Sequence, residues 1–227
     1  MTAPFGPGLF TFLEELREHN DRDWFQANRA RYEADVREPA LDFIEAFRPR
    51  LEQLSPHLVA DARPSGGSLF RIHRDTRFSK DKRPYKTHCG IFFRHQRAKE
   101  AQTPGLYLHL APGEVFCGGG IRHPDGPALA RLRECIATDP EAWTQATHQG
   151  VFAERYRIWG DALKRAPAGY DPAHPLIEDL KRKDFIAIAG LEPDAPLRDG
   201  FEDELSAVWG AMVPYLRFLG RALDVPI

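Results

Sequence analysis

The sequence predicts an α+β protein with a helical N-terminal segment, a central, mainly antiparallel sheet and C-terminal helices. Two observations carry this prediction. Helix-period apolar patterns fill residues 1–60, and short β-rich segments separated by turn residues follow at 66–120, without alternating strand–helix units. The remainder, 121–227, is mixed and ends in a long apolar stripe. We expect a single domain over 1–227, because no convincing linker divides the chain and 227 residues suit one core.

The N-terminal part is expected to form consecutive helices. Thr11 and Glu14 have the spacing of a capping box, and Asn20 is expected to cap the next helix. Pro39 should kink a helix or begin a new one, because proline lacks an N–H and crowds the preceding turn. A strong helical period of apolar residues follows and ends before Ser55-Pro56: Ala40, Phe43, Ile44, Phe47, Leu51 and Leu54.

The middle of the chain predicts an antiparallel meander. Four segments have the length and composition of strands, with a hairpin turn at 111–114: 68–73, 87–94, 104–110 and 115–118. Alternation in the first strand would place Phe70 and Ile72 toward the core and Arg71 and His73 on the other face. The triplet Gly118-Gly119-Gly120 indicates a bulge or a tight turn.

Helices dominate the C-terminal part. We expect helices at 126–137 and 173–180, strands at 155–159 and 184–189, and a helix that begins with Asp139 as its cap and Pro140 at its first position. The last helix has acidic residues at its start, basic residues at its end and a continuous apolar stripe: Leu205, Val208, Trp209, Met212, Leu216 and Leu219.

Composition excludes several classes of protein. No apolar run approaches the roughly 20 residues of a membrane span, and the N-terminus lacks the pattern of a secretory signal. Three cysteines without a CxxC pair argue against a disulfide framework or a zinc ribbon, and favour a reducing cytoplasm. A formal net charge of -2 argues against a protein that coats nucleic acid with its whole surface. Nothing in the sequence indicates an oligomeric state.

Residues 71–86 carry far more positive charge than the chain as a whole. We call this run the basic loop; it reads RIHRDTRFSKDKRPYK and carries seven cationic and two acidic side chains, so its net charge is +5. Such a concentration of charge calls either for an anionic partner or for internal carboxylates. Its position between two predicted strands favours a folded site over an unstructured basic tail.

The loop has the side chains that a small anionic ligand needs. Guanidinium groups donate in a planar, bidentate fashion to phosphate or carboxylate, and lysines add point charges. Asp75, flanked by arginines, should have a lowered pKa and orient them rather than transfer protons, and Phe78 is expected to anchor the loop in apolar surroundings. The candidate ligand-binding residues are Arg71, Arg74, Asp75, Arg77, Lys82, Tyr85 and Lys86.

Other interpretations of the loop stay open. It could bind nucleic acid, with Arg94, Arg97 and Lys99 extending the surface, or its arginines could be purely structural partners of carboxylates from the N-terminal helices. Whether a reaction is catalysed, and by which residues, is left open.

No cofactor or metal is expected, because nucleotide-loop and nucleophile motifs are absent and the histidines and cysteines lack metal-ligand spacing. Tyr107 and His109 are expected to share one face of a strand.

The basic loop resembles the signature of the DUF2461 family of uncharacterised bacterial proteins. The family pattern is R-x-x-R-D-x-R-F, followed by an acid-Lys pair and a Tyr. The pair here is Asp81-Lys82, one residue nearer to Phe78 than in that pattern. The resemblance extends to 21–25, 104–120, 164–170 and His174, and so covers most of the chain. It implies a bacterial source but brings no activity, substrate or catalytic residue with it.

Overall fold

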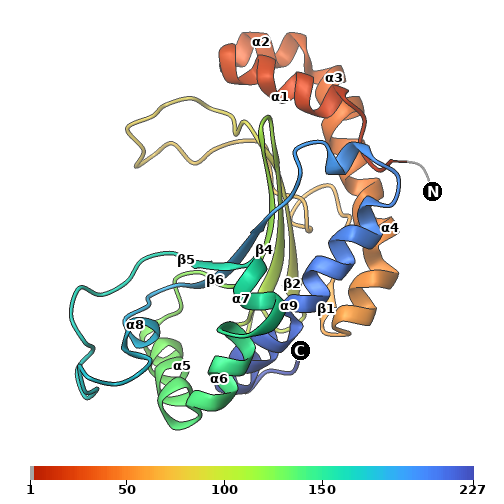
Figure 1. Ribbon diagram of the computed structural model, residues 1–227. Helices are drawn as coiled ribbons and strands as arrows, with labels where there is room; N and C mark the ends of the chain where they lie inside the picture. The colour runs from red at the N-terminus through yellow and green to blue at the C-terminus, as the bar shows by residue number, and fades with distance from the viewer. Residues whose placement is uncertain (1–2) are drawn as a thin grey trace.

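The computed structural model describes residues 3–227 and is built around a six-stranded sheet in which every neighbouring pair is antiparallel. The strand order is β1-β2-β3-β4-β6-β5. The strands are β1 (Leu58–Val59), β2 (Cys89–His95), β3 (Gly105–Ala111), β4 (Glu114–Ile121), β5 (Arg157–Trp159) and β6 (Phe185–Gly190). With helices before and after this sheet, the α+β prediction is confirmed (Figure 1).

Helices cover one face of the sheet and both of its ends. In Figure 1 the first three helices lie at one end, and α5, α6 and α8 lie at the other. The elements before the sheet are α1 (Gly8–Glu18), α2 (Arg22–Ala27), α3 (Arg29–Tyr32), a π-helical turn η1 (Glu33–Arg37) and α4 (Glu38–Leu54). Those after β4 are α5 (Gly126–Thr138), α6 (Pro140–Thr147), α7 (Gly150–Arg155), α8 (Ile177–Leu180), a 3-10 turn η2 (Ala195–Leu197) and α9 (Phe201–Leu223).

Two of the expected helix caps are wrong. The first helix begins at Gly8, so Thr11 sits inside it and its hydroxyl donates to the carbonyl of Pro7. The second helix is capped by Asp21, whose carboxylate accepts from the N–H of Trp24, rather than by Asn20. The first helix has no side-chain cap, because its N-cap position is occupied by Pro7; the second has two candidate caps side by side, and the tertiary position of the chain selects Asp21.

The other helix starts follow local sequence. Asp139 caps α6, its carboxylate accepting from the N–H of Ala142, with Pro140 at the first position. Pro39 stands at the start of α4, directly after the π-turn η1. A proline ring crowds the turn before it and removes an N–H, which accounts for the widened turn at that point.

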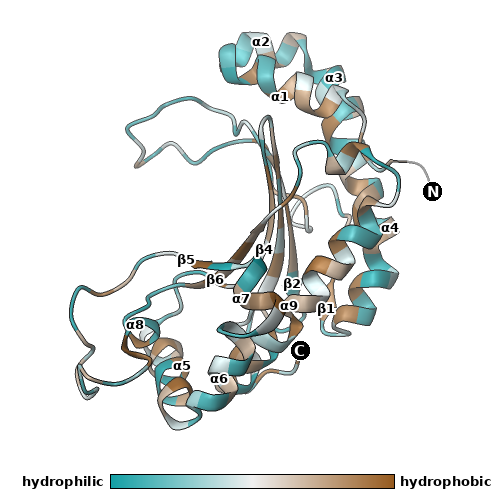
Figure 2. Ribbon diagram, in the orientation of Figure 1, coloured by the Kyte–Doolittle hydropathy of each residue, from teal (hydrophilic) through white to brown (hydrophobic). Residues whose placement is uncertain are grey.

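The core lies between the sheet and helices α4 and α9. Trp209 of α9 is fully buried and meets Phe47 of α4 and Phe93 of β2 edge to face, with ring centroids 5.3 and 5.8 Å apart. Figure 2 shows the strands mostly in hydrophobic colours, whereas the segment that leaves the sheet before β2 is mostly hydrophilic. None of the helices within residues 3–227 combines the length and the apolar character needed to cross a membrane.

The glycine triplet lies inside a strand rather than in a turn, and one of its residues makes room for α9. All three residues lie inside β4, in regular register with β3 and β6. A Cβ at Gly119 would collide with the sulfur of Met212, and the indole N–H of Trp209 donates to the carbonyl of Gly118 at 3.2 Å. The absence of a side chain at Gly119 therefore lets α9 approach the strand backbone closely.

The expected first strand, 68–73, is only partly formed. Single bridges join Leu69 to Ile91 and His73 to Tyr85, and no continuous ladder lies between them. Because cross-strand partners share a face, Leu69 lies on the core side with Ile91, and Phe70 lies on the opposite face. The expected inward direction of Phe70 is therefore wrong, whereas Ile72 is buried as expected.

Candidate functional site

The basic loop leaves the sheet as a hairpin-like projection. At its base the N–H of Arg74 donates to the carbonyl of Pro84, and the N–H of Lys86 donates to that of Ile72, each at 2.8 Å. The loop extends away from the helix-covered side of the sheet and appears in yellow in Figure 1. Arg71 and Lys86 therefore stay beside the sheet, while the residues between Arg74 and Pro84 form the projection.

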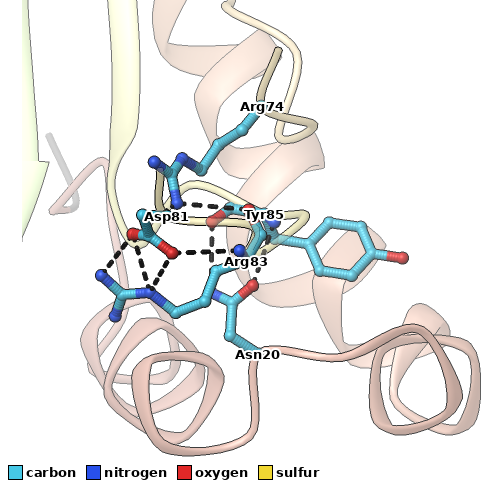
Figure 3. A network of polar contacts seen from close by, with 5 residues as sticks. All are labelled: Asn20, Arg74, Asp81, Arg83 and Tyr85. Carbon is cyan, nitrogen blue, oxygen red and sulfur yellow. Dashed lines mark hydrogen bonds and ion pairs between the residues drawn. The ribbon is translucent and has the colours of Figure 1, made fainter. Parts of the chain in front are cut away.

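The carboxylate of Asp81 accepts hydrogen bonds from two arginines of the loop, as Figure 3 shows. It accepts from Arg74 at 2.8 Å and from Arg83 at 2.7 Å. These hydrogen bonds, those of Arg83 above all, hold the pKa of Asp81 far below its usual range. Arg74 is thus paired inside the loop, and not with a carboxylate of the N-terminal helices.

A second pair stiffens the outer part of the loop. Arg77 grips Asp75 in a bidentate manner, with its Nε and terminal nitrogen 3.0 and 2.7 Å from the two carboxylate oxygens. The pKa of Asp75 is lowered, first by this hydrogen bond, in agreement with its expected role of orienting an arginine. Lys82 donates to the carbonyl of Thr76 at 2.9 Å. These three side chains organise the loop itself.

Tyr85 fixes the base of the loop to the N-terminal helices. Its ring is buried and stacks on Phe25, with centroids 4.1 Å apart. Asn20 donates to the carbonyl of Tyr85 and accepts from its N–H, at 3.1 and 3.0 Å (Figure 3). Asn20 therefore acts as a strand-like partner for the loop base, which explains why it does not cap α2.

Phe78 does not anchor the loop, contrary to expectation. Its side chain is 95% exposed, and its close ring contact is with the guanidinium of Arg77, 5.8 Å from the centroid. The sequence shows an apolar residue between charges, but not whether a hydrophobic surface lies within its reach.

Replacing Phe78 with Ser should leave the free energy of unfolding unchanged within about 0.5 kcal/mol, because an exposed side chain buries no apolar area. Urea denaturation measures this quantity. A loss of several kcal/mol, comparable to that of a truncated core phenylalanine such as Phe47→Ala, would restore the anchoring role.

A cleft of about 510 Å³ opens at the base of the loop, and we call it the basic cleft. Four cationic side chains line it: Arg37, Arg71, Lys86 and Arg94. Its other walls are Tyr32, Leu69, Phe70 and the segment Pro64, Ser65, Gly66 and Gly67. Among the described residues that line it none is acidic, so the cleft concentrates positive charge.

Three parts of the fold bring these cations together. Arg37 ends the π-turn η1, and its guanidinium donates to the carbonyl of Pro64. Arg94 stands on β2 and donates to the carbonyl of Gly66 at 3.3 Å. Arg71 and Lys86 come from the two ends of the basic loop, and the ammonium of Lys86 donates to the carbonyl of Arg71 at 2.6 Å.

Charge in the cleft is compensated only in part. Arg37 pairs with Glu33 at 2.6 Å. Within residues 3–227, Arg71, Lys86 and Arg94 have no carboxylate partner within ion-pair distance. Burial, and then the charge of Arg71, lower the pKa of Lys86. An anion placed between these groups would relieve the repulsion that they exert on one another.

The structure thus separates the candidate ligand-binding residues into two groups. Arg71 and Lys86 line the basic cleft, whereas the other five stabilise the loop or its base: Arg74, Asp75, Arg77, Lys82 and Tyr85. Sequence reasoning missed Tyr32 and Arg37 as neighbours of the loop. The only local signal for Arg37 is Pro39, which disturbs the helix just before it.

The histidines do not assemble with other metal-ligating side chains. Across the part of the chain that the structure describes, no group of three or more His, Cys, Asp or Glu residues could hold a metal ion. Tyr107 and His109 do share a face of β3, and the hydroxyl of Tyr107 lies 3.0 Å from Nδ1 of His109.

Comparison with known proteins gives one match. A family model described as "Conserved hypothetical protein (DUF2461)" matches residues 8–218, which is nearly the whole chain. No curated protein and no solved structure matches the chain.

Proposed function

We propose that this chain, which belongs to the DUF2461 family, binds a small anionic molecule that bears a phosphate or a carboxylate in the basic cleft. The observation that carries the proposal is the convergence of Arg37, Arg71, Lys86 and Arg94 on one cavity. Within the described chain, three of these cations have no carboxylate within ion-pair distance, and a ligand anion in the cleft would provide one.

The dimensions and chemistry of the cleft suit a small molecule. Ligand pockets usually measure about 300–1,000 Å³, and the cleft lies within that range. Arginine offers paired donors that match the oxygens of phosphate or carboxylate, and each charge-assisted hydrogen bond contributes roughly 1.5–3 kcal/mol. Tyr32 and Leu69 add apolar walls, which exclude water and strengthen these electrostatic contacts.

Thermal stability in the presence of anions tests the proposal. Inorganic phosphate, sugar phosphates and dicarboxylates should be screened; a ligand present at about 100 times its Kd should stabilise the protein by about 2.7 kcal/mol.

Arg71→Ala should weaken binding of such a ligand by about tenfold or more, because it removes a charged donor from the cleft. Arg77→Ala is the matched control: it removes the same charge from the same loop, but outside the cleft, and should leave affinity unchanged. Equal losses in both variants, or no stabilisation by any anion, would contradict the proposal.

Nucleic-acid binding through the basic loop is the alternative. It is supported by the exposed side chains at the end of the projection, where Phe78 lies beside Arg77 and Lys80. Binding of several phosphates would make log K fall steeply with log salt, by nearly one unit of slope per phosphate. The chain's net charge of -2 counts against this alternative.

We also propose a cytoplasmic location in a bacterium. Three cysteines without disulfide spacing support it, and all three thiols are free.

A further inference from the structure

The face of the sheet opposite to α4 and α9 carries a cluster of aromatic rings. Ile91 of β2 and Leu108 of β3 are paired and point into the core, so their neighbours point to the other face. Six half-buried rings gather there, and we call them the aromatic platform: Phe70, His88, Phe92, Tyr107, His109 and Phe116.

The rings of the platform are contiguous. Phe70 lies 6.1 Å from Phe92 and 5.8 Å from Tyr107, measured between centroids. His109 stacks on Phe116 at 4.5 Å and 9°, and on its other side meets His88 at 4.5 Å. The platform therefore offers a continuous aromatic surface several rings long, which keeps partial contact with solvent.

The platform begins where the basic cleft ends. Phe70 belongs to both, because it lines the cleft and contacts Tyr107. The ammonium of Lys86 stands 5.3 Å from the centroid of the Phe70 ring, in a cation–π contact. A ligand whose anionic group occupies the cleft would thus place its next few atoms against aromatic rings.

The two histidines give the platform polar as well as apolar contacts. Nδ1 of His109 pairs with the hydroxyl of Tyr107, which leaves Nε2 for other partners; Nε2 lies 4.0 Å from the exposed Glu114. No residue from 3 to 227 makes a hydrogen bond to the imidazole of His88. Burial lowers the pKa of both imidazoles to about 4, so near neutral pH each is uncharged; His88 offers one donor and one acceptor, and His109 offers its Nε2. Such groups suit the polar edge of a heteroaromatic ring better than a plain hydrocarbon ring.

We propose that the ligand is a mononucleotide or a molecule of the same chemical class, whose phosphate binds in the basic cleft and whose heteroaromatic ring stacks on the platform at Phe70 and Tyr107. This inference rests on the proposed function of the cleft. A cleft of about 510 Å³ suits one small molecule, whereas a nucleic-acid strand needs a long basic track. The net charge of -2 also favours the small molecule.

Isothermal titration of the full chain with a short series of probes tests the inference. The probes are adenosine monophosphate, uridine monophosphate, ribose 5-phosphate and inorganic phosphate. At least one nucleotide should bind about tenfold or more tightly than ribose 5-phosphate, because stacking of a base on an aromatic side chain contributes at that level. Arg71→Ala should weaken binding of all four probes.

Two variants distinguish the contribution of ring stacking to the affinity from that of phosphate binding. Phe70→Leu removes a ring but keeps an apolar side chain, and it should reduce the preference for the nucleotide to about threefold or less. Tyr107→Leu lies outside the cleft; it should weaken nucleotide binding and leave the affinity for ribose 5-phosphate unchanged. The melting temperature of each variant shows whether it is folded, and the probe series on the unaltered protein decides the question even if a variant is not.

The anion site and the nucleotide inference are contradicted by different binding results. Equal affinities for nucleotides and ribose 5-phosphate, both lost in Arg71→Ala, would overturn the nucleotide inference and leave the anion site standing. Absence of binding by all four probes would overturn the nucleotide inference, and the same absence with dicarboxylates added to the series would overturn the anion site as well. A third outcome would also overturn the inference: tight binding of a single-stranded oligonucleotide without binding of a mononucleotide. In that case log K should fall with log salt at a slope that corresponds to several phosphates.

Discussion

Gly120→Ala is expected to destabilise the protein by at least about 3 kcal/mol. The residue has a φ of +127°, which side chains of L-residues rarely adopt, and a Cβ there would overlap the backbone oxygen of Phe185 on β6. Relief requires the β4–β6 pairing to separate, because a backbone atom cannot rotate away as a side chain can. Urea denaturation measures the loss as a lower midpoint at an unchanged slope.

Gly113→Ala is the control that separates strain from collision. Gly113 also has a positive φ, +76°, but a Cβ there meets nothing within 4 Å. Its substitution should therefore cost only the conformational strain, about 1–2 kcal/mol. If both substitutions cost the same, the close approach of β6 to Gly120 plays no part in stability.

Acidification from pH 7 to pH 5 is expected to destabilise the protein by about 2–4 kcal/mol through His88 and His109; the upper value takes the full shift of both groups, and the lower allows for solvent screening of two half-buried side chains. Burial lowers the pKa of each from 6.5 to about 4, and for His88 the neighbouring His109 and Lys86 add to the effect. Between these two pH values the unfolded chain binds more protons than the folded one. The two histidines therefore leave the free energy of unfolding at its full value above pH 6.5. They lower it as the pH falls toward 4, by up to about 1.4 kcal/mol per pH unit for each histidine.

His88→Leu should remove about half of this pH dependence, since one titrating group is gone and the other loses a neighbour. His19→Leu is the matched control, because it removes an exposed histidine outside the platform by the same substitution. Free energies of unfolding at pH 5 and pH 7 for the three proteins provide the comparison. An unaltered pH dependence in His88→Leu would show that the imidazole is not buried as described.

Much of the secondary structure could be predicted from local patterns. The strands β2, β3, β4 and β6 lie within a few residues of their expected positions, and α9 follows the stripe that ends the chain. These elements carry strong alternation or strong helical periodicity, and that periodicity persists in any tertiary context. Residues 68–73 carry an equally plausible strand pattern but form only single bridges, because pairing also needs a neighbour along the whole segment.

The candidate site was predictable only at the two ends of the basic loop. The sequence places Arg71 and Lys86 beside a sheet, and the cleft lies there. Arg37 lies 34 positions before Arg71, and nothing local connects the two. Their meeting depends on the π-turn before Pro39 and on how the N-terminal helices pack against the sheet edge.

The sequence by itself determined the family, the α+β class and the concentration of charge between residues 71 and 86, because these follow from the order and spacing of residues. Only the tertiary structure decided which charges are available to a ligand. Arg74 and Arg77 find carboxylates within the loop, whereas Arg71 and Lys86 stand beside Arg94 with none. The physical reason is that an ion pair depends on distances of a few ångströms between side chains, and the fold sets those distances.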